Sequence, residues 1–263
     1  MSDHGDVTGG PTVEPARRIE VFACDIDGCL AAAGHAAYDL PVLRRMADLN
    51  ALSSVADEVP ALTLVTGRPH AYLDAVSQVL GIELTMSFEN GAGLATRRPY
   101  RAWLSRAAEE GRRDLDAFTA LVGKTPTMTL QLGKVASLSV FPVGGHPYDE
   151  LVTDIDAMIE RNGFSLVTDP STDCVNVLVP GVDKGSGFAW LLDELGVAPE
   201  AVAGIGDSVG DVPWLAQCGV SVAPANAVGE VKAAVTRVFE VPDVQAALAA
   251  YLWLVEENRR IQG

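Results

Sequence analysis

Short apolar runs alternate with helical patterns of hydrophobic residues at both ends of the chain. The apolar runs predict strands over 18–24, 61–66, 82–88, 201–205, 220–223 and 238–241. Hydrophobic positions spaced by three and four residues predict helices over 39–56, 69–80, 184–195, 212–217 and 228–235. Strands that are apolar almost throughout are typical of a parallel sheet covered on both faces. The two ends of the chain therefore predict an α/β fold.

The middle of the chain has a different pattern. An amphipathic helix over 104–122 is followed by two short strands with alternating polarity, and a second helix, over 146–161, is followed by two more strands. The strands are predicted over 127–132, 135–141, 164–167 and 174–179, with a hairpin turn at Gly133 and Lys134. This α-β-β-α-β-β order predicts a small antiparallel sheet with helices on one face, inserted as a lid over a site.

These changes of pattern divide the chain. The Gly-, Pro- and Asp-containing residues 1–17 are predicted to be a disordered tail. Residues 18–93 and 180–263 are predicted to build the α/β core together, and residues 94–179 are predicted to form the inserted domain.

Composition narrows the possible partners. The net charge of −16 argues against nucleic acid or an anionic membrane surface as partner, because both bind basic surfaces. The start of the chain lacks the apolar segment of a signal peptide, and the apolar run 246–255 is too short to cross a bilayer. The cysteines show neither a CxxC motif nor metal-ligand spacing, which predicts reduced thiols in a cytoplasmic protein: Cys24, Cys29, Cys174 and Cys218.

Two carboxylates directly follow the first strand, in the stretch FACDIDGCL. Asp25 and Asp27 are two positions apart and should point to the same side. Ligands of open α/β sheets bind at the carboxyl ends of the strands, so both carboxylates are candidates for a ligand site. Gly28 allows a sharp turn behind them. The alternative is a structural turn in which an aspartate only caps the strand end.

A hydroxyl and a lysine provide candidate phosphate contacts. Thr66 and Gly67 end a second strand before a helix, where a hydroxyl and free amides suit a phosphate oxygen; Thr66 as a simple helix cap is the alternative. We interpret the neighbouring Arg68 as a surface charge in preference to a gate. Lys184 opens a helix, where the helix dipole disfavours a cation. It is therefore either held by nearby acids or an ordinary surface lysine.

The stretch GIGDSVGD, residues 204–211, resembles a dinucleotide-binding loop only superficially. Its third glycine falls one position late, and Asp207 and Asp211 would repel a phosphate unless a cation intervenes. Together with Asp25 and Asp27 these carboxylates describe an oxygen-rich site of the kind that Mg²⁺ prefers.

The order DxDG, TGR, DKG and GDSxxD resembles the haloacid dehalogenase-like (HAD) phosphohydrolases, and most closely their Cof-like branch. Glu89-Asn-Gly-Ala92 and Ala225-Asn-Ala227 support the resemblance, which covers about residues 18–260. It implies a Rossmann-like, doubly wound parallel sheet with an inserted αββαββ cap. Two positions depart from the branch, which usually has Thr in place of Cys29 and Asn in place of Gly210. The lost Asn removes a contact to the lysine or to the metal's waters.

The resemblance also implies roles for the site residues. Asp25 would be the nucleophile that forms an aspartyl-phosphate, and Asp27 the general acid and then the base. Mg²⁺ would be held by the Asp25 carboxylate, the Asp27 backbone carbonyl and Asp207, with Asp211 in or near its coordination sphere. The side chains of Thr66 and Lys184 and the amides at Gly67 would hold the phosphate oxygens.

The function expected from these features is Mg²⁺-dependent hydrolysis of a small phosphorylated metabolite, a phosphosugar or a phosphoglycolate-like acid. Polarity alone suggests four cap residues for specificity: Gln131, Lys134, His146 and Tyr148. The protein is expected to be a monomer or a homodimer. A phosphomutase of the same superfamily and a receiver-like module that accepts phosphate without turnover are the alternatives.

Overall fold

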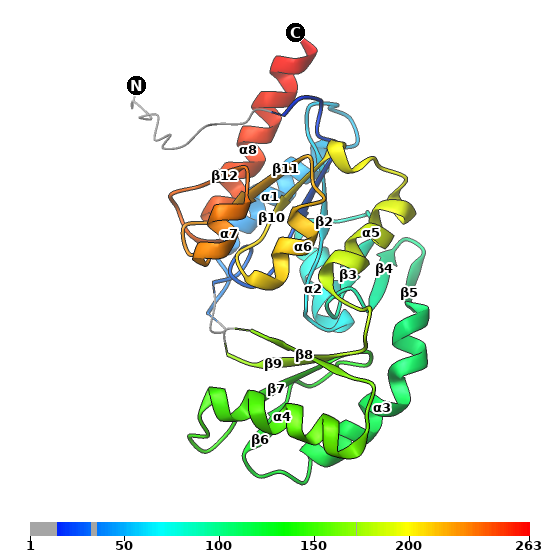
Figure 1. Cartoon of the computed structure of the whole chain (residues 1–263). Coiled ribbons are helices and arrows are strands. Elements are labelled where there is room, and N and C mark those ends of the chain that lie inside the picture. The colour runs from blue at the N-terminus through cyan, green and yellow to red at the C-terminus, as the bar shows by residue number, and fades with distance from the viewer. Residues whose placement is uncertain (1–14, 33–35, 172) are drawn as a thin grey trace.

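The computed structural model describes residues 15–32, 36–171 and 173–263. Figure 1 shows a larger body built by the two ends of the chain and a smaller body built by its middle, drawn in green. The predicted tail, residues 1–17, falls largely outside the described ranges.

The larger body contains a five-stranded parallel sheet, which confirms the predicted α/β class. Its strands pair in the order β12 (Arg237–Val238), β11 (Val220–Ala223), β10 (Val202–Ile205), β1 (Val21–Cys24) and β2 (Ala61–Leu64). The strand β1 is fully buried because its four residues, VFAC, are apolar. It pairs Cys24 with Ile205 on one side and with Leu64 on the other. The residues that follow these three strands therefore emerge at the same edge of the sheet.

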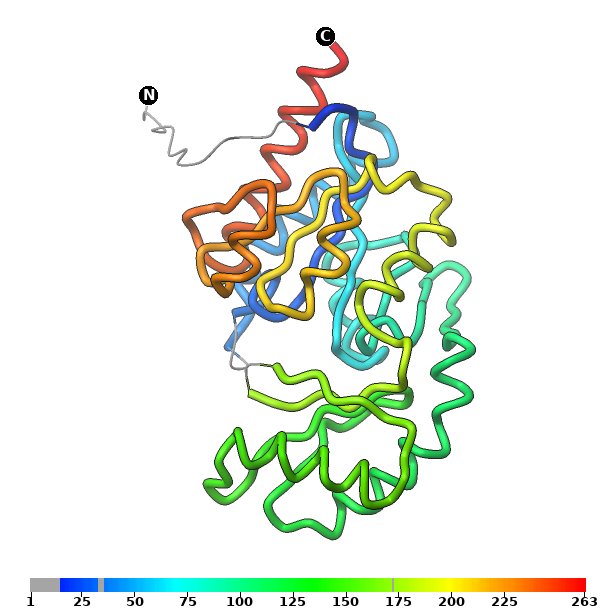
Figure 2. The backbone as a smooth tube through the Cα atoms, viewed as in Figure 1, coloured from blue at the N-terminus to red at the C-terminus, as the bar shows by residue number. Residues whose placement is uncertain are grey.

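Helices cover both faces of this sheet, as Figures 1 and 2 show. One hydrophobic cluster joins a sheet face to α1 (Leu40–Leu52), α2 (His70–Leu80) and α8 (Asp243–Gln262). A second cluster joins the other face to α5 (Lys184–Leu195), α6 (Val212–Leu215) and α7 (Gly229–Ala234). The helix α8 is absent from our sequence prediction. It is fixed by Tyr251, whose hydroxyl donates to Pro60 O at 2.6 Å, and by Asn258, which bonds the backbone of Ile19.

The smaller body contains a four-stranded antiparallel sheet and two helices with their own hydrophobic cluster. Its elements follow the predicted order α-β-β-α-β-β: α3 (Arg106–Val122), β6 (Met128–Leu130), β7 (Leu138–Pro142), α4 (Tyr148–Asn162), β8 (Val167–Pro170) and β9 (Val175–Leu178). Figure 1 shows both helices on the side of this sheet that faces away from the parallel sheet. The predicted hairpin is confirmed, because β6 and β7 pair antiparallel. The two-residue turn predicted at Gly133 and Lys134 is wrong, because β6 ends at Leu130 and a loop of residues 131–137 connects it to β7.

A third sheet lies where the chain passes between the two bodies. It orders β3 (Met86–Phe88), β4 (Gly93–Arg97) and β5 (Tyr100–Leu104), and β4 and β5 are absent from our sequence prediction. Residues 94–104, assigned above to the inserted domain, thus pair with β3, which was assigned to the core. The domain boundaries stay a prediction.

The structure also describes the cysteines and the apolar character of the helices. All four cysteines are free thiols. Within the described ranges, no helix combines the length and the apolar character that crossing a membrane requires.

Candidate active site

The carboxylates of the first and fourth motifs meet where the strand order reverses. The chain goes from β1 to β2 on one side and later returns to β10 on the other, and such a switch point is where open α/β sheets bind ligands. Asp25 and Asp27 follow β1, and Asp207 follows β10. Gly28 has a φ of +74°, and a Cβ there would lie 2.1 Å from Asp207 Oδ2. Only glycine both fits this turn and lets Asp207 approach it.

Lys184 lies between two buried aspartates. Its Nζ donates to Asp25 Oδ2 at 2.9 Å and to Asp211 Oδ1 at 2.6 Å. The helix α5 begins at Lys184, with Asp183 as its N-cap, and the lysine side chain is only 9% exposed. The prediction that acids hold this lysine is confirmed, and the alternative of a surface lysine is wrong.

Burial and mutual repulsion control the protonation of this cluster. Burial raises the pKa of Asp25 well above its usual value, although the charge of Lys184 offsets part of the effect. Burial, together with the charge of Asp211, raises the pKa of Asp207 to about 7. Burial opposes ionisation of Asp211 too, but Lys184 and the hydrogen bonds from Trp214 and Ser208 together outweigh it and lower the pKa of Asp211. A further cation near Asp25 and Asp207 would therefore favour the charged forms of both carboxylates.

The same acids fit a divalent cation. One oxygen each of Asp25, Asp207 and Asp211 lies within 4.8 Å of the others. Among the described residues, no donor is bonded to the Asp207 carboxylate. Asp211 differs, because its two oxygens already accept from Lys184, Trp214 Nε1, Ser208 Oγ and the amides of residues 207 and 208. Hard carboxylate oxygens that repel one another match the preference of Mg²⁺.

Arg68 is not the surface charge that we predicted. Its guanidinium donates to both oxygens of Asp27, at 2.7 and 2.5 Å, and lies 4.7 Å from the ring centre of Tyr72. The Arg68 side chain is 13% exposed, against 43% for Asp27. A bidentate ion pair with Arg68 therefore holds Asp27 at the rim of the site.

The second motif lies beside this pair. Thr66 is buried, and its Oγ1 accepts the Arg68 N–H at 3.1 Å, which leaves the hydroxyl proton free to be donated. Thr66 does not cap α2, because that helix begins at His70 with Pro69 as its N-cap. Gly67 faces Asn90, and a Cβ there would lie 2.7 Å from Asn90 Oδ1.

A cavity of about 510 Å³ separates these groups from the antiparallel sheet. Its wall on the parallel-sheet side includes Asp25, Asp27, Gly67, Arg68, Asn90, Lys184 and Asp207, and its opposite wall includes Gln131, Lys134, Ser139, Asp169 and Asn176. Of the four proposed specificity residues, Gln131 and Lys134 line the cavity. His146 and Tyr148 do not: His146 Nε2 lies 3.2 Å from Asp154, and the Tyr148 hydroxyl donates to Ser171 O. Polarity alone could not distinguish these two pairs.

Glu89 joins the two walls, a role that the sequence analysis missed. Its fully buried carboxylate accepts the N–H groups of three loop residues, Val135, Ala136 and Ser137, at 2.7 to 3.1 Å. The N–H of Glu89 donates to Arg68 O, so one residue contacts both the second motif and the loop. A glutamate followed by Asn90 and a glycine after an apolar strand was the available signal.

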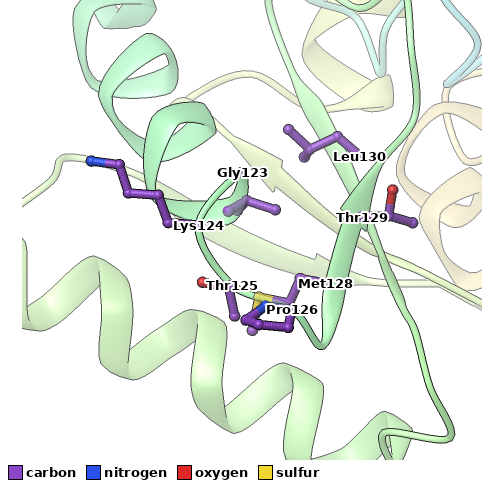
Figure 3. A pocket seen from close by; sticks show the side chains of 8 residues that line it. Gly123, Lys124, Thr125, Pro126, Met128, Thr129 and Leu130 are labelled. Atoms are coloured by element: carbon purple, nitrogen blue, oxygen red, sulfur yellow. The ribbon is translucent and has the colours of Figure 1, made fainter.

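A second hollow, of about 400 Å³, lies between the end of α3 and β6 (Figure 3). Among the eight residues that line it, Lys124 is the only ionisable one, and its side chain extends away from the others. This hollow offers no grouping of acids, bases or nucleophiles, so the candidate active site is the cavity beneath the parallel sheet.

Replacing Lys184 by Met should weaken the fold. The change keeps the length of the side chain but leaves Asp25 and Asp211 buried without their cation. Removal of one partner of a buried ion pair typically costs about 3–5 kcal/mol, so the free energy of unfolding in urea should fall by that order. The exposed Lys124→Met is the matched control and should change it little. Equal stability of the two variants would contradict the role assigned to Lys184.

The chain resembles known proteins in both sequence and fold. A family model described as haloacid dehalogenase-like hydrolase matches residues 146–252. A phosphoglycolate phosphatase from Methanothermobacter thermautotrophicus is 26% identical over 249 residues, covering 93% of this chain and 100% of the relative. Among solved structures, a Thermoplasma acidophilum protein has a TM-score of 0.71 at 18% identity, over 90% of this chain and 99% of its own. The sucrose-phosphatase from Synechocystis has a TM-score of 0.65 at 16% identity, over 90% and 98% of the two chains. The chain is thus similar to haloacid dehalogenase-like hydrolases over residues 146–252, to phosphoglycolate phosphatases over most of its length, and to both solved structures in its fold.

Proposed function

We propose that this protein hydrolyses the phosphate monoester of a small metabolite through a phosphorylated Asp25. The observation that carries the proposal is the buried Lys184, whose ammonium lies between Asp25 and Asp211 at the switch point of the sheet. A carboxylate fixed beside a cation in a buried site can attack phosphorus while the cation holds an oxygen of the phosphoryl group. Relatives named phosphoglycolate phosphatase support the same reaction class.

Each residue has a defined part in this reaction. One oxygen of Asp25 attacks phosphorus and releases the alcohol, and water later hydrolyses the acyl phosphate. Asp27 protonates the leaving alkoxide and then removes a proton from the water. The hydroxyl of Thr66, the amide at Gly67 and the ammonium of Lys184 hold the phosphate oxygens. Arg68 keeps the Asp27 carboxylate in place at the rim until a substrate enters.

A divalent cation, proposed to be Mg²⁺, completes the site. Asp25 and Asp207 would offer carboxylate oxygens for it and the backbone carbonyl of Asp27 would be a further ligand, while Asp211 holds the loop that carries Asp207. When bound, the cation supplies positive charge that offsets the repulsion between Asp25 and the phosphate. This is how a chain with a net charge of −16 can accept an anionic substrate.

The proposal predicts a strict metal dependence. Purified protein should release p-nitrophenol from p-nitrophenyl phosphate in the presence of Mg²⁺, lose that activity in EDTA and regain it when Mg²⁺ is restored. We expect the apparent affinity for Mg²⁺ to fall in Asp207→Asn, because that change removes one of the proposed ligands. No turnover of p-nitrophenyl phosphate or of a panel of phosphorylated metabolites would overturn the proposal. Isomerisation of a sugar phosphate without phosphate release would identify a mutase instead.

The substrate is proposed to be a small molecule because the antiparallel sheet covers the site. Residues 94–179 are proposed to act as a cap, and their antiparallel sheet forms one wall of the 510 Å³ cavity. A cavity of this size suits a metabolite and excludes a folded phosphoprotein.

A further inference from the structure

We propose that Lys134 selects substrates that carry a carboxylate in addition to the phosphate. This inference rests on the proposed function and assigns the substrate class of the same site. It starts from the wall opposite Asp25, where Lys134 lines the cavity together with Ser139, Asn176 and Asp169.

Lys134 is held in the cavity wall by its own loop. The three residues that follow it donate their N–H groups to the buried carboxylate of Glu89. On the other side, Gly133 lies against Pro69, to which a Cβ at Gly133 would come within 3.8 Å. The loop is thus fixed to the segment that contains Gly67 and Arg68, which places Lys134 at a defined position relative to the phosphate site.

The ammonium of Lys134 has unused donor capacity. Its hydrogen-bond partner is a neutral hydroxyl: Nζ donates to Ser139 Oγ at 2.6 Å. The chain of polar contacts continues from Ser139 Oγ to Asn176 Oδ1 at 2.7 Å and from Asn176 Nδ2 to Asp169 Oδ2 at 3.2 Å. Among the described residues, no carboxylate oxygen lies within 4.0 Å of Lys134 Nζ. An ammonium has three donors, so two remain for a ligand.

The other two cations that line the cavity are already paired. Lys184 contacts Asp25 and Asp211, and Arg68 contacts Asp27. In the described lining, Lys134 is therefore the cation without a carboxylate partner. Burial lowers the pKa of Lys134 to about 8, although the charge of Glu89 offsets part of this effect, and a bound anion would stabilise the charged ammonium.

The charges on the cavity wall opposite Asp25 would also orient a bound substrate that carries a carboxylate. Asp169 lies at the far end of the polar chain from Lys134, and Asp173 lines the cavity as well. These acids repel a carboxylate from their own side of the wall, and Lys134 attracts it to the other. A phosphorylated acid would place its phosphate at Asp25 and Lys184 and its carboxylate at Lys134.

The test compares two substrates that differ only in this group. Phosphoglycolate carries a carboxylate where 2-hydroxyethyl phosphate carries a hydroxymethyl group. The wild-type protein should have the higher kcat/KM for phosphoglycolate, and Lys134→Met should reduce the ratio of the two values roughly 10- to 100-fold, as expected for a lost charged hydrogen bond. Lys134→Arg should restore part of the preference, and Lys124→Met, in the exposed turn after α3, should leave the ratio unchanged.

Other outcomes separate this inference from the proposed function. If the wild-type protein hydrolyses p-nitrophenyl phosphate but Lys134→Met lowers kcat/KM equally for both substrates, or for neither, the inference is overturned and the phosphatase assignment stands. If no ester is hydrolysed, the proposed function fails. Calorimetric binding of phosphoglycolate in Mg²⁺ then tests Lys134 directly, and equal affinity of the wild-type and Lys134→Met proteins overturns the inference. Thermal melting of each variant confirms that it is folded.

Discussion

Asp25→Asn should reduce phosphate release to the level of the reaction without enzyme. The amide has the shape of the carboxylate but lacks the negative charge that attacks phosphorus, and no covalent phosphoenzyme can form without it. Steady-state release of phosphate from p-nitrophenyl phosphate measures the loss. Acid-quenched protein should carry phosphate on residue 25 in the wild type and none in the variant.

Loss of folding would imitate this result, and the structure indicates that it should not occur. Asp25→Asn removes one of two anions beside Lys184, but it also removes a buried charge whose desolvation is costly. The two effects oppose each other and Lys184 keeps Asp211 as its partner, so the free energy of unfolding should change less than in Lys184→Met. Asp193→Asn, on an exposed part of α5, is the matched control and should keep full activity. Full activity of Asp25→Asn would reduce Asp25 to a turn residue at a strand end.

The positions of the site acids could be predicted from the sequence because they depend on strand ends alone. In a parallel sheet, the residue after each strand emerges at a known edge, so Asp25 and Asp207 could be brought together without coordinates. Lys184 could be predicted because a cation at a helix start is unfavourable without an acidic partner. Each inference used a local signal that a single segment carries.

Arg68 and Glu89 make contacts with residues far away in the sequence, which local sequence patterns could not predict. Arg68 was misinterpreted because its partner, Asp27, lies 41 positions earlier, and nothing in the stretch TGRP specifies that pairing. The loop 131–137 was misread as a tight turn for a similar reason. Its amides find their acceptor in Glu89, 46 to 48 positions away, so the hairpin of β6 and β7 closes through a longer loop in place of a tight turn.

The unpredicted elements of the fold have the same origin. The strands β4 and β5 pair with each other and with β3, but the run 93–104 contains charged and small residues in place of a clear alternating pattern. The helix α8 contains the apolar run 246–255, which was considered only as a membrane segment. The structure shows why this run is apolar: it packs on the sheet face that α1 and α2 also cover.

Asp27→Asn should reduce turnover on the order of 10²- to 10⁴-fold, and the loss should depend on the leaving group. The variant keeps the nucleophile and the backbone carbonyl at residue 27 but cannot protonate an alkoxide. Phosphoglycolate, whose leaving group is an alkoxide, should suffer most. p-Nitrophenol leaves without a proton, so its phosphoryl transfer step should survive better. Hydrolysis of the phosphoenzyme still needs a base, so an initial burst of p-nitrophenol should precede slow turnover.

The ion pair with Arg68 provides the control that isolates the proton transfer. Asp27→Asn removes both the acid and the anion that Arg68 contacts, whereas Arg68→Met removes only the contact. If proton transfer is the cause, Arg68→Met should slow both substrates by a similar and smaller factor, because it disturbs the position of Asp27 but leaves its carboxyl group. If Arg68→Met instead reproduced the leaving-group dependence and the burst, Asp27 would act through its ion pair, and its assignment as general acid would be wrong.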